Sequence, residues 1–275
     1  MKICVIGASG LLGGATCAAL RTDGHEVHGI SRPEFDLRQH DLASSLPADC
    51  EAVVLAAGAP GNSDPASLFE EDVSGAMRVA AFFAAQPQIR RAVYCSSGAV
   101  YGHRAAPSDE GTPLAPAGNY AMSRVVAENV FRAQFGARFT AARLFFPYGP
   151  GQRPQRLVSR LITAVRAGNP IRLQGVAGTP VINPVFVADA AAILAAATYD
   201  NAAPDIVNIC GPDHVSIREL ALAIGDLCGT VPLFEVGPDV DGNMLGASCT
   251  HLMARTALTA GLRLTLASMA GDVSS

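Results

Sequence analysis

The stretch VIGASGLLGG, residues 5–14, decides the fold, because a short apolar run meets Gly7, Gly10 and Gly13 in GxxGxxG spacing. An apolar run that stops at a glycine predicts a buried β-strand, and the Ala- and Leu-rich residues behind it predict a helix. Glycines at such a turn let backbone N–H groups approach a pyrophosphate, whose charge the N-terminus of the helix favours. The stretch therefore predicts a dinucleotide-binding unit.

Outward from this unit, the first 150 residues alternate between apolar β-branched runs and longer Ala-rich runs. The strand-like segments are KICVIG, HEVHGIS, AVVLAAG, RAVYCSS and FTAARLFF, and the helical segments begin near residues 11, 65 and 119. Alternation of this kind predicts an α/β fold with a Rossmann-type doubly wound parallel sheet. The runs are continuously apolar, as expected for strands that are buried on both faces.

The rhythm changes after PYGPGQRP, residues 147–154, where prolines break the chain into short elements. We therefore expect residues 1–150 to form an NAD(P)-binding Rossmann domain, with later returns to that domain near residues 184–211. Residues 151–275 are expected to form mainly a small C-terminal substrate-binding lobe. The two returns are VFVADAAAILAAA and DIVNICG, which repeat the first pattern.

Composition excludes several classes of function. Of the 275 residues 49% are hydrophobic and 16% charged, and the formal net charge is −4, which is unlike a nucleic-acid-binding protein. No apolar run reaches the ~18 residues that a membrane-spanning helix needs. The seven cysteines lack CxxC spacing and the six histidines lack HxxxH spacing. We therefore expect no metal site, and reduced thiols in a cytoplasmic protein.

The residues after the second predicted strand bear on the choice of cofactor. A carboxylate there would hydrogen-bond the ribose 2′-hydroxyl of NAD and repel a 2′-phosphate, but this chain has Ser31 and Arg32. A hydroxyl and a guanidinium accommodate a phosphate, so NADP is favoured over NAD. The alternative is that Arg32, which precedes Pro33, is an ordinary solvated loop residue.

With these motifs in order, the chain from Met1 to about Gly229 resembles an extended short-chain dehydrogenase/reductase of the NAD-dependent epimerase/dehydratase family. Asp36 and Leu37 stand where the family has an acidic and aliphatic pair beside the adenine, and Asp72 stands where asparagine is usual. The resemblance implies cofactor contacts at Gly7, Ser9, Gly10, Leu11, Leu12, Gly13, Ser31, Arg32, Asp36, Leu37, Ala56, Ala57, Gly58, Tyr120, Arg124 and Phe146.

The resemblance also implies a catalytic set. VYCSSGAVYG resembles the family's serine strand and places the catalytic hydroxyl at Ser97, and YAMSRVVAE matches its tyrosine helix. Tyr120 is expected to be the acid/base and Ser97 to donate to the substrate oxygen. An acid/base tyrosine has to titrate nearer neutrality than its reference pKa of about 10, and a neighbouring cation favours the phenolate. That cation is a lysine in the family, whereas this chain has Arg124, which is bulkier and planar.

Departures from the family pattern narrow the reaction. The 4,6-dehydratases carry Asp and Glu directly after the catalytic hydroxyl, and this chain has Gly98 and Ala99. Phe146 stands where an asparagine usually faces the nucleotide sugar, and Ile182 stands where an arginine commonly meets a substrate phosphate. Both changes exchange a polar contact for an apolar one. The reactions that remain for this chain are therefore simple oxidation, reduction or 4-epimerisation, and dehydration is not expected.

We therefore expect an NAD(P)-dependent oxidoreductase or epimerase that acts on a secondary alcohol or ketone, with a nucleotide sugar as the family's default substrate. Two alternatives stay open: a catalytically silenced NAD(P)-binding regulatory or scaffold protein, and a reductase of a non-nucleotide ketone. A homodimer is also expected by resemblance, through helices at about 65–85 and 119–135. The apolar residues available for it are Phe82, Phe83, Val126 and Val130.

Overall fold

The computed structural model describes residues 1–38, 42, 45–239, 244–249 and 253–271. Its centre is a six-stranded sheet in the order β2-β1-β3-β4-β5-β8, with every neighbouring pair parallel. The strands are β1 (Lys2–Ile6), β2 (Glu26–Ile30), β3 (Ala52–Leu55), β4 (Arg91–Ser97), β5 (Phe139–Leu144) and β8 (Ile206–Ile209). The sequence-based prediction of a doubly wound parallel sheet is confirmed.

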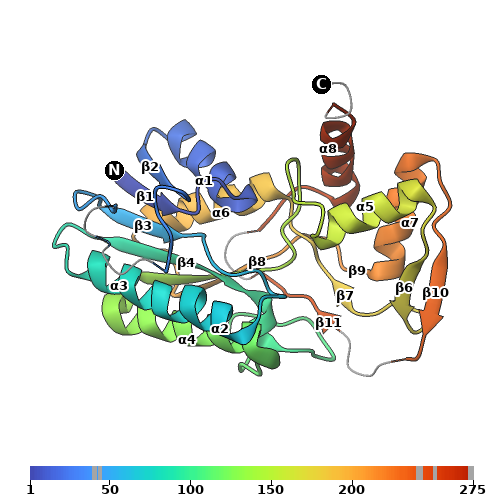
Figure 1. Cartoon of the computed structure of the whole chain (residues 1–275), viewed down its shortest axis with the longest axis horizontal. Coiled ribbons are helices and arrows are strands. Elements are labelled where there is room, and N and C mark those ends of the chain that lie inside the picture. Colours follow the sequence, from blue (N-terminus) through green and yellow to red (C-terminus); the bar gives the residue numbers. More distant parts are fainter. Residues whose placement is uncertain (39–41, 43–44, 240–243, 250–252, 272–275) are drawn as a thin grey trace.

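Helices cover both faces of this sheet (Figure 1). One face carries α1 (Leu11–Thr22) and α6 (Val187–Tyr199), and the other carries α3 (Ala76–Ala84) and α4 (Gly118–Phe135). Alternation along β1 shows why both faces are buried: Ile3 packs with the residues of α1 and α6, whereas the next residue, Cys4, packs with those of α3 and α4. This is the arrangement that continuously apolar strands predict.

The helix expected at about residues 65–85 is divided into three pieces. It begins as α2 (Pro65–Leu68), which Asp64 caps through the backbone N–H groups of Ala66 and Ser67. It then widens into the π-helical segment η1 (Phe69–Gly75) before continuing as α3. A π-helical turn inserted in a helix is rare and is frequent at functional sites.

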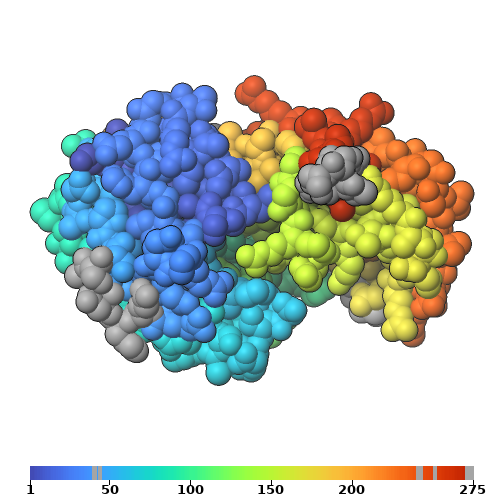
Figure 2. Space-filling view, turned by 45° about the horizontal axis from the view of Figure 1, so that its top comes forward, coloured from blue at the N-terminus to red at the C-terminus, as the bar shows by residue number. Residues whose placement is uncertain are grey.

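Apart from α6 and β8, the chain beyond residue 150 forms a second group of short elements beside the carboxyl ends of the sheet's strands (Figure 1), and this group makes up one end of the molecule in Figure 2. Two small sheets pair β10 with β6 and β11 with β7 and β9. Helices α5, α7 and α8 pack with them around a separate apolar core that includes Leu161, Ile162 and Leu220. The bounds are α5 (Leu157–Ala167), β6 (Ile171–Gln174), β7 (Val181–Ile182), β9 (Val215–Ser216), α7 (Ile217–Cys228), β10 (Phe234–Gly237), β11 (Met244–Leu245) and α8 (Leu258–Gly271).

Two further expectations concern the cysteines and the membrane. The prediction of reduced thiols is wrong for Cys210 and Cys249, which are joined as a disulfide although 39 residues separate them in the sequence. The end of β8 and the segment after β11 bring them together, and sequence spacing does not reveal that contact. The other five cysteines are free.

Within the described ranges, no helix is long and apolar enough to cross a bilayer.

Candidate active site

The glycine turn between β1 and α1 is packed so closely that side chains are excluded. Gly7 has φ +96°, and a Cβ there would lie 2.8 Å from the backbone nitrogen of Ala57. A Cβ on Gly13 would overlap the Gly7 carbonyl oxygen. Helix α1 follows with Gly10 at its N-cap and no side chain capping its first turn. The first N–H groups of the helix are thus left for an anion, which is the arrangement that phosphate groups favour.

The end of β2 lies against this turn. Ser31 is tied to it, because the backbone N–H of Ser9 donates to the Ser31 hydroxyl at 2.7 Å. Arg32, the next residue, is exposed. Asp36 is held by Arg38 at 2.6 Å, and hydrogen bonding from that guanidinium lowers the pKa of Asp36 to about 2. Asp36 is therefore an ionised carboxylate with a partner of its own.

Ala56, Ala57 and Gly58 extend β3 toward the same edge of the sheet. The Ala56 N–H donates to the Ile6 carbonyl at 2.8 Å, so these residues lie beside the glycine turn. Leu37 is buried and packs against Gly75, where a Cβ would lie 2.8 Å from the leucine Cβ. Leu37, predicted to lie beside the adenine, and Ala56–Gly58, predicted to line the cofactor, belong to separate segments and lie at the same edge of the sheet.

The two serines at the end of β4 have different surroundings. Ser96 is buried and donates its hydroxyl to Glu128, which in turn pairs with Arg143 at 2.7 Å. Ser97 is half-buried, caps the 3-10 turn η2 (Gly98–Tyr101), and accepts the N–H of Ala99 at 3.2 Å. In the described part of the chain the Ser97 hydroxyl proton has no acceptor, whereas the Ser96 hydroxyl donates to buried Glu128.

Tyr120 and Arg124 lie one turn apart on α4, and the Arg124 guanidinium carbon is 5.0 Å from the centroid of the Tyr120 ring. Tyr120 is half-buried and Arg124 is only 6% exposed. Arg124 also reaches the carbonyl of Cys95 at 3.4 Å, two residues before Ser97. The structure therefore places the predicted cation against the strand that carries the predicted serine, with the ring of Tyr120 beside that cation.

The charge of Arg124 is maintained in spite of burial. Desolvation lowers its pKa, but the neighbouring Tyr120, Tyr94 and Asp72 more than compensate and raise the pKa above the ordinary arginine value. Its Nη2 lies 3.3 Å from Asp72, and its Nη1 donates to the Tyr94 hydroxyl at 3.0 Å. Tyr94 and Asp72 were not among the predicted site residues. The sequence did contain a signal for this pair: Asp72 stands where the family usually has asparagine, and Arg124 stands where it has lysine.

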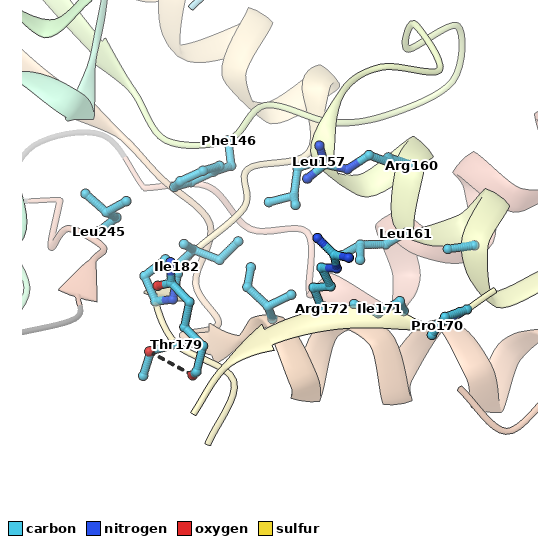
Figure 3. A pocket seen from close by; sticks show the side chains of 14 residues that line it. Phe146, Leu157, Arg160, Leu161, Pro170, Ile171, Arg172, Thr179, Ile182 and Leu245 are labelled. Atoms are coloured by element: carbon cyan, nitrogen blue, oxygen red, sulfur yellow. Dashed lines mark hydrogen bonds between the residues drawn. The ribbon is translucent and has the colours of Figure 1, made fainter. Parts of the chain in front are cut away.

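Phe146 is the non-glycine residue of the described chain with positive φ, +47°, and it lies at the opening of a separate pocket. This pocket, of about 540 Å³, lies between α5, β6 and β7, and its lining is mainly apolar (Figure 3). Ile182 lines it as well, and Arg160 and Arg172 stand among its walls. Phe146 follows β5 by two residues, and Leu144 at the end of β5 pairs with Ser97. The pocket thus adjoins the edge that carries Ser97 and Tyr120.

Away from this edge, the described residues contain a cluster that sequence spacing did not reveal. His28, Asp49 and Cys50 bring potential ligand atoms within 4.8 Å of one another. Asp49 is already paired with Lys2 at 2.7 Å. Asp49 and Cys50 precede β3 and so lie at the opposite end of that strand from Ala56–Gly58. The cluster is separate from the candidate active site.

Comparisons with known proteins agree with the fold. The model of the NAD dependent epimerase/dehydratase family matches residues 3–210. An uncharacterized UDP-glucose epimerase YtcB of Bacillus subtilis (strain 168) is 26% identical over 263 residues, covering 83% of each chain. The structure of MoeE5 in complex with UDP-glucose and NAD has TM-score 0.85 and 25% identity, covering 99% of this chain and 100% of that one.

A further structure shares the fold at lower identity. The UDP-glucose 4-epimerase of Thermus thermophilus in complex with NAD has TM-score 0.83 and 21% identity, and the match covers 98% of this chain and 99% of that one.

Proposed function

The chain belongs to the NAD dependent epimerase/dehydratase family, and on that premise we propose that it is a nicotinamide-dependent enzyme acting at a secondary alcohol of a nucleotide sugar, as a 4-epimerase or keto-reductase. The observation that carries the proposal is the Arg124 guanidinium 5.0 Å from the Tyr120 ring at the end of β4. It places a permanent cation beside a half-buried phenol, which is what proton exchange with a substrate hydroxyl requires. The names of the relatives, which include UDP-glucose epimerases, support the same class.

The residues present fit a dinucleotide. The glycine turn leaves room for a pyrophosphate at the uncapped start of α1. Arg124 Nε is buried and has no hydrogen-bond partner within the described part of the chain, so a donor is left for a ribose hydroxyl. Ser9, Leu11, Leu12 and Phe146 are proposed to contribute further contacts by position alone. When bound, the nicotinamide would accept or return the hydride.

The chain's own residues would carry the protons. Tyr120 takes the proton of the substrate hydroxyl as the alcohol is oxidised and returns it on reduction. Ser97 donates its free hydroxyl proton to the same oxygen and stabilises its developing charge. Arg124 supplies a positive charge beside the Tyr120 ring. Because Gly98 and Ala99 lack carboxylates, there is no acid/base pair after Ser97 for a dehydration.

For the cofactor we propose NAD as the resident form, because MoeE5 and the Thermus thermophilus enzyme were solved with it. NADP is expected to bind as well, since Ser31 and exposed Arg32 follow β2 and no carboxylate stands there to repel a 2′-phosphate. Measuring the dissociation constants of NADH and NADPH for the wild type and Arg32→Ala tests this. An unchanged NADPH affinity in Arg32→Ala would show that Arg32 is a solvated loop residue.

A substrate assay separates the first proposal from a silenced binding protein. Wild type, Tyr120→Phe and Arg124→Lys are incubated with NAD or NADPH and a panel of UDP-sugars and their 4-keto derivatives. Turnover by wild type, lost by roughly 100-fold or more in Tyr120→Phe, supports the enzyme. Cofactor binding without turnover, together with a gain of turnover in Arg124→Lys, would support the silenced protein instead.

A second candidate, a reductase of a non-nucleotide ketone, is favoured by the lining of the pocket. Phe146, Leu157, Leu161 and Ile182 are apolar, and a diphosphate among them would depend on Arg160 and Arg172. Arg172 is largely solvated and already paired with Glu235 at 3.2 Å. Failure of UDP to raise the melting temperature would favour this candidate, because ligands that bind the native state stabilise it.

We also propose a homodimer through α3 and α4. Met77 is 51% exposed on α3, and Met122 and Val126 are 49% and 37% exposed on α4. The sequence-based assignment of Phe83 to this surface is wrong, because Phe83 is fully buried in the chain's own core. Phe82 and Val130 are partly buried against the same core. Light scattering of wild type beside Val126→Glu tests the interface, and a monomeric wild type would refute it.

A further inference from the structure

The Arg124 guanidinium is held in place by four partners. Nη1 contacts the Tyr94 hydroxyl at 3.0 Å and the Cys95 carbonyl at 3.4 Å. Nη2 contacts the Ala59 carbonyl and Asp72 Oδ1, each at 3.3 Å. A guanidinium has five N–H donors, of which the terminal nitrogens carry four. The remaining donor, Nε–H, is buried and has no hydrogen-bond partner among the described residues, so it is the one that a ligand could use.

Asp72 is the charged partner in this set, and it is itself fixed from two sides. It is 2% exposed, its Oδ1 accepts the Ala59 N–H at 2.8 Å, and its Oδ2 accepts the Ser123 hydroxyl at 3.0 Å. It sits in the middle of the π-helical segment η1, whose wider turn interrupts the helix at this point. One carboxylate therefore joins η1, the loop after β3 and α4.

The loop after β3 leaves room for this ion pair. A Cβ at Gly58 would lie 2.7 Å from Asp72 Oδ1 and 2.8 Å from Arg124 Nη2. Contacts under 3.0 Å force something to shift, so a Cβ at Gly58 would displace the Asp72 carboxylate, the Arg124 guanidinium or both. The Asp72–Arg124 ion pair in its present position thus depends on glycine at position 58.

We propose that Asp72 is a positioning residue that orients Arg124, and that the two act as one unit, so that either side chain alone serves the site worse than a matched replacement of both. The proposal rests on the proposed function, because it concerns the cation beside Tyr120. Lys at position 124 carries a single compact ammonium and cannot span Tyr94, Asp72 and two carbonyls together. With Asp72 present, it would be drawn toward the carboxylate and away from the ligand.

Asp72 also sets the charge of the site. With both side chains ionised the pair is nearly neutral, so Tyr120 experiences an ion pair and not an isolated cation. Replacing Asp72 by Asn removes the negative member and leaves the buried positive charge without its partner, and an unopposed cation favours deprotonation of a neighbouring acid. The alkaline-favoured rise of the reaction rate should therefore move to lower pH in Asp72→Asn.

A double-mutant cycle tests the proposal: wild type, Asp72→Asn, Arg124→Lys and the double variant. Each is measured for NADH dissociation constant, kcat, KM, pH–rate profile and melting temperature. We expect each single variant to lose roughly tenfold in kcat with little change in KM. The double variant should retain more activity than either single variant, so its loss should be more than about tenfold smaller than the product of the two single losses, as expected for residues coupled in one ion-pair network.

Glu128→Gln is the matched control, because it breaks another buried carboxylate–arginine pair, that of Glu128 and Arg143. It should lower the melting temperature and leave the pH–rate profile where it is. The proposal is overturned if the losses of Asp72→Asn and Arg124→Lys simply multiply, or if Asp72→Asn leaves the pH–rate profile unmoved.

The cycle still tests the coupling of Asp72 and Arg124 if neither wild type nor any variant turns over a sugar nucleotide. In that case the proposed function fails, and the NADH dissociation constants decide the present proposal. Non-additive losses of NADH affinity across the cycle support coupling of Asp72 and Arg124, and additive losses overturn it.

Discussion

Gly58→Ala should impair catalysis while leaving the protein folded. The added Cβ would stand 2.7 Å from Asp72 Oδ1 and 2.8 Å from Arg124 Nη2, so the ion pair has to open or shift. A shifted guanidinium also weakens the hydrogen bonds that Arg124 donates to Tyr94 and to the carbonyls of Cys95 and Ala59, and one hydrogen bond from a charged group contributes ~1.5–3 kcal/mol. At ~1.36 kcal/mol for each tenfold change in rate, loss of that bond corresponds to roughly a 10- to 150-fold fall in kcat. Overpacking of this kind costs the fold about 1–3 kcal/mol.

The assay is steady-state turnover with the best sugar nucleotide, accompanied by urea unfolding and NADH binding. Gly61→Ala is the control, because a Cβ there would lie 3.6 Å from the Tyr120 ring, an ordinary contact in the same loop. Activity within a factor of about two of wild type in Gly58→Ala would refute the reasoning, as would an equal loss in Gly61→Ala. Either result would mean that the position of the Arg124 guanidinium does not limit the rate.

Three other expectations follow from the contacts. Glu128→Gln should cost about 3–5 kcal/mol of unfolding free energy by leaving buried Arg143 unpaired, and a shift of the urea midpoint equivalent to less than about 1 kcal/mol would contradict this. Arg38→Met should lower stability only where Asp36 is ionised. The pKa of Asp36 is lowered to about 2 in the folded protein and is about 4 in the unfolded chain. The stabilisation by the Asp36–Arg38 pair is therefore complete above about pH 4 and is lost as the pH falls through about 2. A difference in urea midpoint between wild type and Arg38→Met that does not change with pH would be inconsistent with this expectation. Phe146→Asn relieves a bulky residue at φ +47° and adds an amide to the pocket, so stability should change little while UDP should raise the melting temperature more than in wild type; an unchanged UDP shift would contradict it.

Much of the sheet could be predicted from local sequence pattern. The strands are short apolar runs, and the first glycine turn has a spacing that sterics impose, since Gly7 and Gly13 leave no room for side chains. Such information is local, so the order of strands and helices was readable without contacts between distant segments. The choice of Ser97 over Ser96 came from resemblance, and the structure supplies a physical reason, because Ser96 is bonded to Glu128.

The rest depended on contacts that sequence pattern does not encode. The π-helical turn around Asp72 interrupts a segment whose composition predicts one ordinary helix, and the pairing of Asp72 with Arg124 joins segments that are far apart in the sequence. Strands β7, β9 and β11 have two residues each, which is too short for an alternating pattern to show. The positive φ of Phe146 is likewise unexpected, because bulky residues rarely adopt it.

The central claim is that Tyr120, beside Arg124, exchanges a proton with a nucleotide-sugar hydroxyl while the nicotinamide exchanges the hydride. The most direct measurement mixes NAD-loaded protein with UDP-glucose and records the absorbance of reduced nicotinamide together with inversion at C4. The account predicts that wild type forms reduced nicotinamide and the C4 epimer, and that Tyr120→Phe binds NAD equally well but is slower by roughly 100-fold or more. Equal rates in wild type and Tyr120→Phe, or binding of both ligands by wild type with neither reduction nor inversion, would contradict it.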